Sequence, residues 1–143
     1  MDRIEECISF QLGKAYQQIT RRAREALAMH GITPVQYATL CVLWERDGLS
    51  CADLCARLIL DSATMTGIVD RLETAGCVER RRGPDGDRRL SRVYLTASGN
   101  TLREPLQAAM DAMNREIDAH LGQAAGAVRR ALTAIGASSR EAT

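Results

Sequence analysis

Arginine side chains are concentrated in one short stretch of this chain. Residues 80–92 contain two acids, Asp85 and Asp87, against six arginines: Arg80, Arg81, Arg82, Arg88, Arg89 and Arg92. The formal net charge of all 143 residues is only +1, so this excess is local. Guanidinium groups suit the phosphate backbone and the narrow minor groove of DNA, where the potential is most negative. A solvated loop is the commoner interpretation of an isolated charge run, and the surrounding elements must decide between the two.

Small and hydroxyl-bearing residues lie upstream of the arginines and begin a predicted helix: Ser62, Ala63, Thr64, Thr66 and Gly67. Such side chains let a helix approach base edges closely in a major groove about 12 Å wide. Serine and threonine can donate to phosphates or accept from bases, whereas helix capping by Ser62 is the simpler interpretation. Asp87 would hold a neighbouring arginine in place through a charge-assisted pair. The candidate DNA-binding set is completed by Arg71, Arg82, Asp87, Arg88 and Arg89.

The residue types needed for catalysis or metal binding are present without the necessary spacing. The two histidines, His30 and His120, are far apart, and there is no glycine-rich phosphate loop, HExxH or nucleophile elbow. With no CxxC pair and no histidine near the cysteines, we expect no metal, no cofactor and no enzyme activity. The odd number of cysteines predicts free thiols acting as small buried hydrophobes: Cys7, Cys41, Cys51, Cys55 and Cys77. Cys7, near the N-terminus, is the candidate redox thiol.

Three predicted helices in the middle of the chain contain a helix-turn-helix. Each begins at a capping residue, and glycines end the first and the last. A short helix, a tight turn and a longer helix form the arrangement that places the second of the pair in the major groove. The predicted helices run from Thr33, with a capping box to Gln36, as far as Gly48; from Ser50 over 51–58; and from Asp61 or Ser62 to Gly76.

Two short strands follow, over 77–81 and 92–95, with a Pro-Asp-Gly turn between them. We interpret this hairpin as a wing that carries the arginines. Because the wing comes directly after the helix-turn-helix, DNA binding is a better interpretation of the charge run than a solvated loop.

Long apolar stripes mark the remaining helices. They are predicted over 4–29, ending at Gly31, then from Thr96 with a bend at Pro105, and last over about 123–135. Stripes of this length cannot all be buried inside one small subunit, and a symmetric partner would cover them. The sequence therefore predicts a homodimer whose two recognition helices reach successive major grooves of double-stranded DNA.

The predicted fold is mainly α with a small β-hairpin wing. We expect one domain over 1–143, with a winged helix-turn-helix at about 32–96 and dimerisation helices at 1–30 and 97–136. No apolar run approaches the roughly 20 residues that span a bilayer. The first ten residues carry acids where a signal peptide needs a basic start, so we expect a cytoplasmic protein that does not contact a membrane.

The chain resembles the MarR family of transcriptional regulators over nearly its whole length. The motifs that carry the resemblance are Ile32 to Tyr37, Leu58 to Thr66, Val69 to Gly76, Pro84 to Arg89 and Leu95 to Gly99. The resemblance implies that Arg89 enters the minor groove with Asp87 as its support, and that the terminal helices hold a triangular dimer. It also implies repression from a pseudo-palindromic operator, relieved by a small ligand, which we expect to be aromatic, or by oxidation.

The family resemblance further implies an effector pocket between the first, second and fifth helices. The candidate lining residues are Ser9, Tyr16, His30, Tyr37 and Trp44, each of which could instead be a core or surface residue. One branch of the family senses organic hydroperoxides through a first-helix cysteine, but that position here falls on Ser9, two residues from Cys7. Two alternatives to a ligand-released regulator stay open: a redox-sensing repressor using Cys7, and a winged-helix protein-interaction module without DNA binding.

Overall fold

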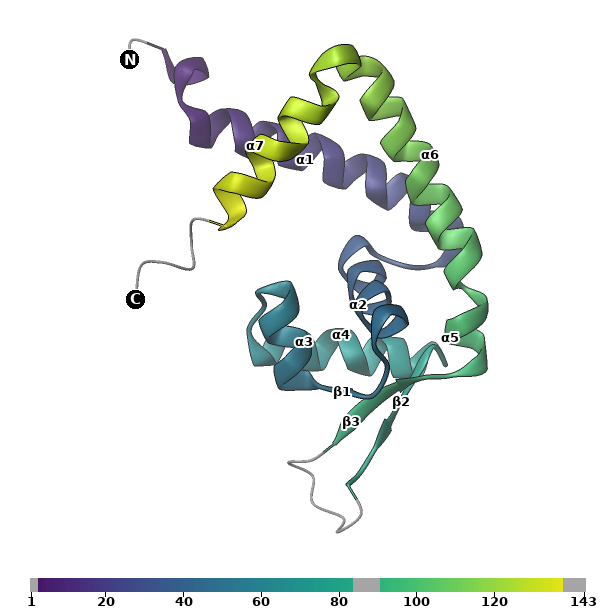
Figure 1. Cartoon of the computed structure of the whole chain (residues 1–143). Coiled ribbons are helices and arrows are strands. Elements are labelled where there is room, and N and C mark those ends of the chain that lie inside the picture. The colour runs from purple at the N-terminus through teal and green to yellow at the C-terminus, as the bar shows by residue number, and fades with distance from the viewer. Residues whose placement is uncertain (1–2, 84–90, 138–143) are drawn as a thin grey trace.

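The computed structural model describes residues 3–83 and 91–137, and places them in two groups of helices, one of which includes a small sheet (Figure 1). Helices α1, α6 and α7 lie together at one end, and α2, α3 and α4 lie with the sheet at the other. The helices are η1 (Ile4–Glu6), α1 (Ile8–Leu27), η2 (Ala28–His30), α2 (Pro34–Glu45), α3 (Cys51–Leu58), α4 (Ser62–Thr74), α5 (Ala97–Thr101), α6 (Arg103–Leu121), η4 (Gly122–Ala124) and α7 (Ala125–Ala137). The strands are β1 (Leu49–Ser50), β2 (Val78–Arg81) and β3 (Arg92–Leu95). The mainly α fold with a β-hairpin is confirmed.

Capping side chains determine where the central helices begin. Thr33 accepts from the backbone N–H of Gln36, whose side chain in turn accepts from the N–H of Thr33, which is the predicted capping box. Ser50 and Asp53 form a second box at the start of α3. Of the two candidates for the start of α4, Asp61 is the cap, because its carboxylate accepts from the N–H of Thr64.

The antiparallel sheet has three strands, in the order β1-β3-β2. The hairpin of β2 and β3 was predicted, but β1 was not, because it is only two residues long. Leu49 of β1 pairs with Val93 of β3, and Asp47 supports this pairing by accepting from the backbone N–H of Leu95 at 2.9 Å. The strand therefore depends on partners far along the chain.

The core of the molecule lies between the central helices and the sheet. Buried side chains recur every three or four residues in the helices and every second residue in the strands, as expected for helices packed on one face of a sheet. The largest fully buried side chains of this part are Leu40, Leu43, Leu54, Met65, Val69, Leu72, Val78 and Val93. This packing fixes α4 and the hairpin relative to one another, and both carry candidate site residues.

Three predicted helix boundaries were wrong. The first helix does not run unbroken over 4–29, because Cys7 is extended and separates η1 from α1. The second ends at Glu45 rather than at Gly48, because Arg46 is extended. The bend expected at Pro105 lies three residues earlier, between α5 and α6 at Leu102. Pro105 sits in the first turn of α6, where its missing N–H costs no helical hydrogen bond.

The terminal helices pack on one another and leave large apolar side chains exposed. α1 contacts α6, and α6 contacts α7. The exposed fraction is 64% for Ile8 and 51% for Leu132. Within the described residues no single helix is both long and apolar enough to cross a membrane; only the pair Ile8–His30 and Pro34–Glu45, bent by 73°, passes that test when taken together.

Candidate nucleic-acid interface

Helix α4 has one buried face and one exposed face. Its buried side chains are Met65, Ile68, Val69 and Leu72. The predicted DNA-binding residues of this helix lie mostly on the other face: Ser62, Ala63, Thr64, Thr66 and Arg71 are exposed, and Gly67 is partly buried. Because close packing holds the buried face, the exposed face is presented in one orientation, as a helix that enters a groove requires.

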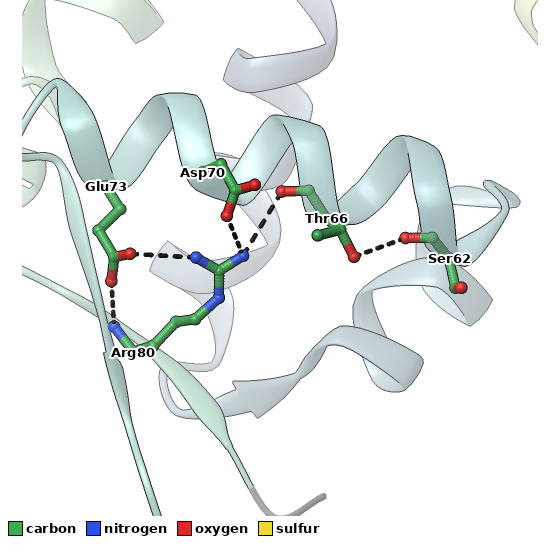
Figure 2. Close-up of polar contacts among 5 residues, drawn as sticks. All are labelled: Ser62, Thr66, Asp70, Glu73 and Arg80. Carbon is green, nitrogen blue, oxygen red and sulfur yellow. Dashed lines mark hydrogen bonds and ion pairs between the residues drawn. The ribbon is translucent and has the colours of Figure 1, made fainter. Parts of the chain in front are cut away.

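The polar groups at the start of α4 are hydrogen-bonded to one another. The carboxylate of Asp61 accepts from the backbone N–H of Thr64 at 2.7 Å and from the hydroxyl of the same residue at 2.9 Å. These bonds hold the pKa of the Asp61 carboxyl below its ordinary value, so it stays ionised at neutral pH. The hydroxyl of Thr66 donates to the backbone carbonyl of Ser62 at 2.8 Å (Figure 2). Both threonine hydroxyls therefore have a defined direction.

Arg80 of strand β2 connects the hairpin to α4 (Figure 2). Its guanidinium contacts the carboxylates of Asp70 at 2.6 Å and Glu73 at 3.0 Å, and it donates to the carbonyl of Thr66 at 3.4 Å. The backbone N–H of Arg80 also donates to Glu73, at 2.9 Å. Burial lowers the pKa of Arg80, but the two carboxylates outweigh it, so the net pKa is raised and the charge is permanent.

Several of the clustered arginines are therefore occupied within the protein. Arg80 is paired with α4, and Arg81 pairs with Glu79 at 2.7 Å while lying 4.3 Å over the ring of Tyr94. Arg92 donates to the carbonyl of Gly48 at 2.9 Å. The local excess counted from the sequence thus overstates the charge that β2 and β3 present to solvent. Arg82 is exposed, whereas Asp87, Arg88 and Arg89 lie outside the described residues.

A cleft of about 570 Å³ lies between the start of α3, the first half of α4 and the hairpin. We call it the helix–wing cleft. It brings together two of the predicted DNA-binding residues, Thr66 and Arg82, with Arg80 and three residues at the start of α3. Its lining residues are Ser50, Cys51, Ala52, Thr66, Arg80, Arg82 and Ser91. Guanidinium and hydroxyl groups of this kind suit an anionic backbone.

Only part of the predicted effector set is brought together. Tyr37 and Trp44 form an edge-to-face pair with ring centroids 6.2 Å apart. Burial raises the pKa of the Tyr37 hydroxyl, with a further contribution from its hydrogen bond to Cys41, so it stays protonated. The indole N–H of Trp44 is engaged with the carbonyl of Gly99 at 3.2 Å. Ser9 and Tyr16 are exposed on α1, and His30 is partly buried at the end of η2.

The cysteines are free, as predicted, but are less buried than expected. Cys77 is buried, whereas Cys7, Cys41, Cys51 and Cys55 are partly exposed. Cys7 occupies the position before the first residue of α1, where the backbone N–H of Phe10, followed by that of Ser9, lowers the pKa of its thiol. The described residues hold no cluster of ligands that could bind a metal.

Sequence reasoning did not find the contact between Arg80 and α4. Arg80 was counted only as one of six cations, although Asp70 and Glu73 lie three residues apart on the preceding helix. This spacing puts both acids on one helix face and was a usable signal. It did not identify which arginine they would bind, because that depends on how the hairpin packs.

Residues 32–90 match the model of the MarR family. The HTH-type transcriptional regulator TtmR of Methylorubrum extorquens (strain PA1) is 38% identical over 100 residues, which cover 70% of this chain and 51% of TtmR. The chain thus spans about half the length of that relative.

Two further relatives cover more of their own length. The organic hydroperoxide resistance transcriptional regulator of Bacillus subtilis (strain 168) is 31% identical over 71% of this chain and 69% of its own. The crystal structure of a probable transcriptional regulator from Pseudomonas aeruginosa is 31% identical, with a TM-score of 0.82 over 92% of this chain and 98% of that one.

Proposed function

The chain belongs to the MarR family of winged helix-turn-helix, DNA-binding transcriptional regulators, and we propose that it is a repressor that binds a pseudo-palindromic operator as a homodimer. The proposal rests mainly on the structure of α4. One face of this helix is fixed in the core, the other presents small hydroxyl side chains, and Arg80 ties it to an arginine-bearing hairpin. A helix so held can read a major groove while the hairpin reaches the adjacent minor groove.

The contacts on DNA divide by chemistry. Thr64, Thr66 and their neighbours at the start of α4 face the base edges, and Arg71 and Arg82 contact phosphates from either side. Arg89, supported by Asp87, together with Arg88, stays a prediction for the minor groove from the sequence.

The dimer is proposed from the terminal helices. Their exposed apolar side chains are the surface that a second copy would cover, and a two-fold axis between the copies would set the spacing of the two α4 helices. On this proposal residues 32–96 read DNA, and residues 1–30 and 97–136 hold the dimer. The site of action is the cytoplasm, where the DNA is.

The test is binding of duplex DNA at several salt concentrations. A selection from random duplexes should enrich one palindromic sequence, and fluorescence anisotropy should give a log–log salt slope of several units for that sequence. Sedimentation should give a dimer without DNA. A protein-interaction module would select no sequence and show little salt dependence, and either result would refute the proposal.

We propose a small aromatic acid as the effector. The support is the Tyr37–Trp44 pair on α2, a helix of the DNA-reading part that also contacts the terminal helix α6. A ligand releases DNA if it binds the wrongly spaced dimer more tightly than the DNA-competent one. A thermal-shift screen of aromatic acids and their thioesters tests this. A hit that stabilises the protein but leaves DNA bound would not be the effector.

A second candidate is redox control through Cys7. The lowered pKa of its thiol favours the thiolate, which is the form that peroxides attack. Native protein and Cys7→Ser are compared for release of DNA after mild peroxide treatment. Release by the native protein alone would favour this candidate over the ligand.

A further inference from the structure

The two threonines at the start of α4 have used their hydroxyl protons inside the protein. Thr64 donates to the carboxylate of Asp61, and Thr66 donates to the carbonyl of Ser62. A hydroxyl has one proton and two lone pairs. Both side chains are exposed, so what they offer to a partner is lone pairs and a methyl group.

This arrangement limits what the threonines can bind on DNA. Phosphate oxygens accept hydrogen bonds and cannot donate them, so they have nothing to offer a hydroxyl whose proton is already engaged. In the major groove the acceptor atoms are guanine O6 and N7, adenine N7 and thymine O4, and these are excluded for the same reason. The donors that remain are the exocyclic amino groups, N6 of adenine and N4 of cytosine.

The methyl groups distinguish these two bases. Adenine is paired with thymine, whose 5-methyl group also lies in the major groove and makes apolar contacts with a threonine methyl. A C·G pair offers the amino group without the methyl. An A·T pair therefore satisfies both parts of a threonine side chain.

We propose that Thr64 and Thr66 read A·T base pairs, each accepting from adenine N6 while its methyl group packs on the thymine methyl. The inference rests on the proposed function, because it takes α4 into the major groove. It replaces the versatile readout expected of hydroxyl side chains with a directional one.

The internal bonds persist when DNA binds because breaking them is costly. Releasing the Thr64 hydroxyl would deprive the ionised Asp61 of a donor at the moment it approaches negative phosphates. Releasing the Thr66 hydroxyl proton would give up its 2.8 Å bond to the carbonyl of Ser62. Arg80 fixes the same residue from the other side, through the carbonyl of Thr66 (Figure 2).

The experiment begins with selection of operator sequences from random duplexes by native protein, Thr64→Val and Thr66→Val. Valine keeps the shape and a methyl group but removes the lone pairs. The base pairs whose preference flattens in each variant are those under that threonine, and they should be A·T in the native site. At those pairs each variant should lose about threefold to tenfold of the native discrimination, the worth of one hydrogen bond.

Base analogues then test each half of the contact. Purine in place of adenine removes the N6 amino group, and uracil in place of thymine removes the methyl group. Native protein should lose affinity with either analogue, whereas Thr66→Val should be indifferent to purine and Thr66→Ser indifferent to uracil. Thr101→Val is the matched control, because Thr101 on α5 makes the same bond to a carbonyl four residues back.

The possible outcomes distinguish failure of the proposed function from failure of the A·T readout alone. If native protein selects no duplex, the proposed function and this inference both fall. If native protein selects a site with G·C under these residues, or tolerates purine, only the inference is overturned. An equal loss on operator and random DNA in Thr66→Val would mean a phosphate contact and overturn it as well. The analogue titrations with native protein decide the question even if a variant fails to fold.

Discussion

The DNA-reading part and the terminal helices of this molecule bury their apolar side chains to very different degrees. In α2, α3, α4 and the sheet, the large side chains fill one core, and Leu54, Met65 and Val93 have no exposed surface. In α1 and α6 only Ala23, Leu27, Leu106 and Met113 are buried, and in α7 no side chain is. Most of the exposed large apolar side chains belong to the terminal part: Ile4, Ile8, Phe10, Tyr16, Ile19, Leu132 and Ile135.

The difference separates two uses of hydrophobic sequence. The central part is stabilised by contacts within one subunit, so its pattern of apolar residues reflects the core of that subunit. The terminal part has more apolar surface than one subunit can cover, and such surface marks an interaction site. The two parts meet at α5. We expect substitutions to have the largest effect at this junction, smaller effects within either part, and the smallest effect at an exposed apolar residue of the DNA-reading part.

The largest effect is expected at Gly99, where the two parts join. A Cβ at this position would lie 2.0 Å from the carbonyl oxygen of Cys77, a backbone atom that cannot move aside easily. Gly99→Ala should lower the free energy of unfolding by about 3 kcal/mol, the upper end of overpacking costs. Ser98→Ala, an exposed neighbour in the same helix, should change it by less than about 0.5 kcal/mol. Equal chemical denaturation curves for both would show that the junction is compliant.

The next effect concerns the exposed apolar side chains of the terminal part. Leu132→Asp places a carboxylate where a second copy is proposed to pack, and burying an unpaired charge is costly. The dimer dissociation constant should rise at least about tenfold, or about 1.4 kcal/mol. Ile59→Asp is the control, because Ile59 is equally apolar and 83% exposed but belongs to the DNA-reading part. Sedimentation that finds both variants as dimeric as native protein would place the dimer interface elsewhere.

A smaller effect is expected from Arg80, within the DNA-reading part. Arg80→Ala removes the contacts with Asp70, Glu73 and Thr66 and should cost about 1 kcal/mol of stability. It should also lower operator affinity, because the hairpin is held less firmly against α4. Arg81→Ala, whose partners lie within the hairpin, should cost less than about 1 kcal/mol. Thermal unfolding and fluorescence anisotropy of both variants measure stability and operator affinity. A larger loss in Arg81→Ala than in Arg80→Ala would contradict this order.

Local signals in the sequence predicted the central helices well. The capping box of Thr33, the left-handed Gly31 and the Ser50 cap are short-range features, and all three are present. Features that depend on distant partners were missed. Strand β1 exists only because Leu49 meets Val93, and no local pattern marks it. The same holds for the site, since the start of α4 was predicted from residue types, whereas the contact of Arg80 with that helix depends on the packing of the hairpin.

The smallest expected effect comes from an exception to the good packing of the DNA-reading part. Ile59, in the turn between α3 and α4, has a φ of 56°, a left-handed conformation that β-branched residues rarely adopt. Its side chain is 83% exposed, so it recovers little energy by burial. Relief of the steric cost, about 1–2 kcal/mol, is partly offset by the greater freedom of glycine in the unfolded chain, about 0.5–1 kcal/mol.

Ile59→Gly should therefore raise the free energy of unfolding by about 0.5–1 kcal/mol. Ile59→Val, which keeps the β-branch, should leave it unchanged, so the pair isolates backbone strain from loss of side-chain contacts. Urea denaturation of the two variants beside native protein measures the difference. Operator affinity, measured in parallel, should be the same in all three if the turn serves only to join the helices. A gain in stability accompanied by a loss of affinity would instead mean that the strained turn contributes to DNA binding. The exposed side chain of Ile59 would then serve a partner, as the exposed apolar side chains of the terminal helices are proposed to do.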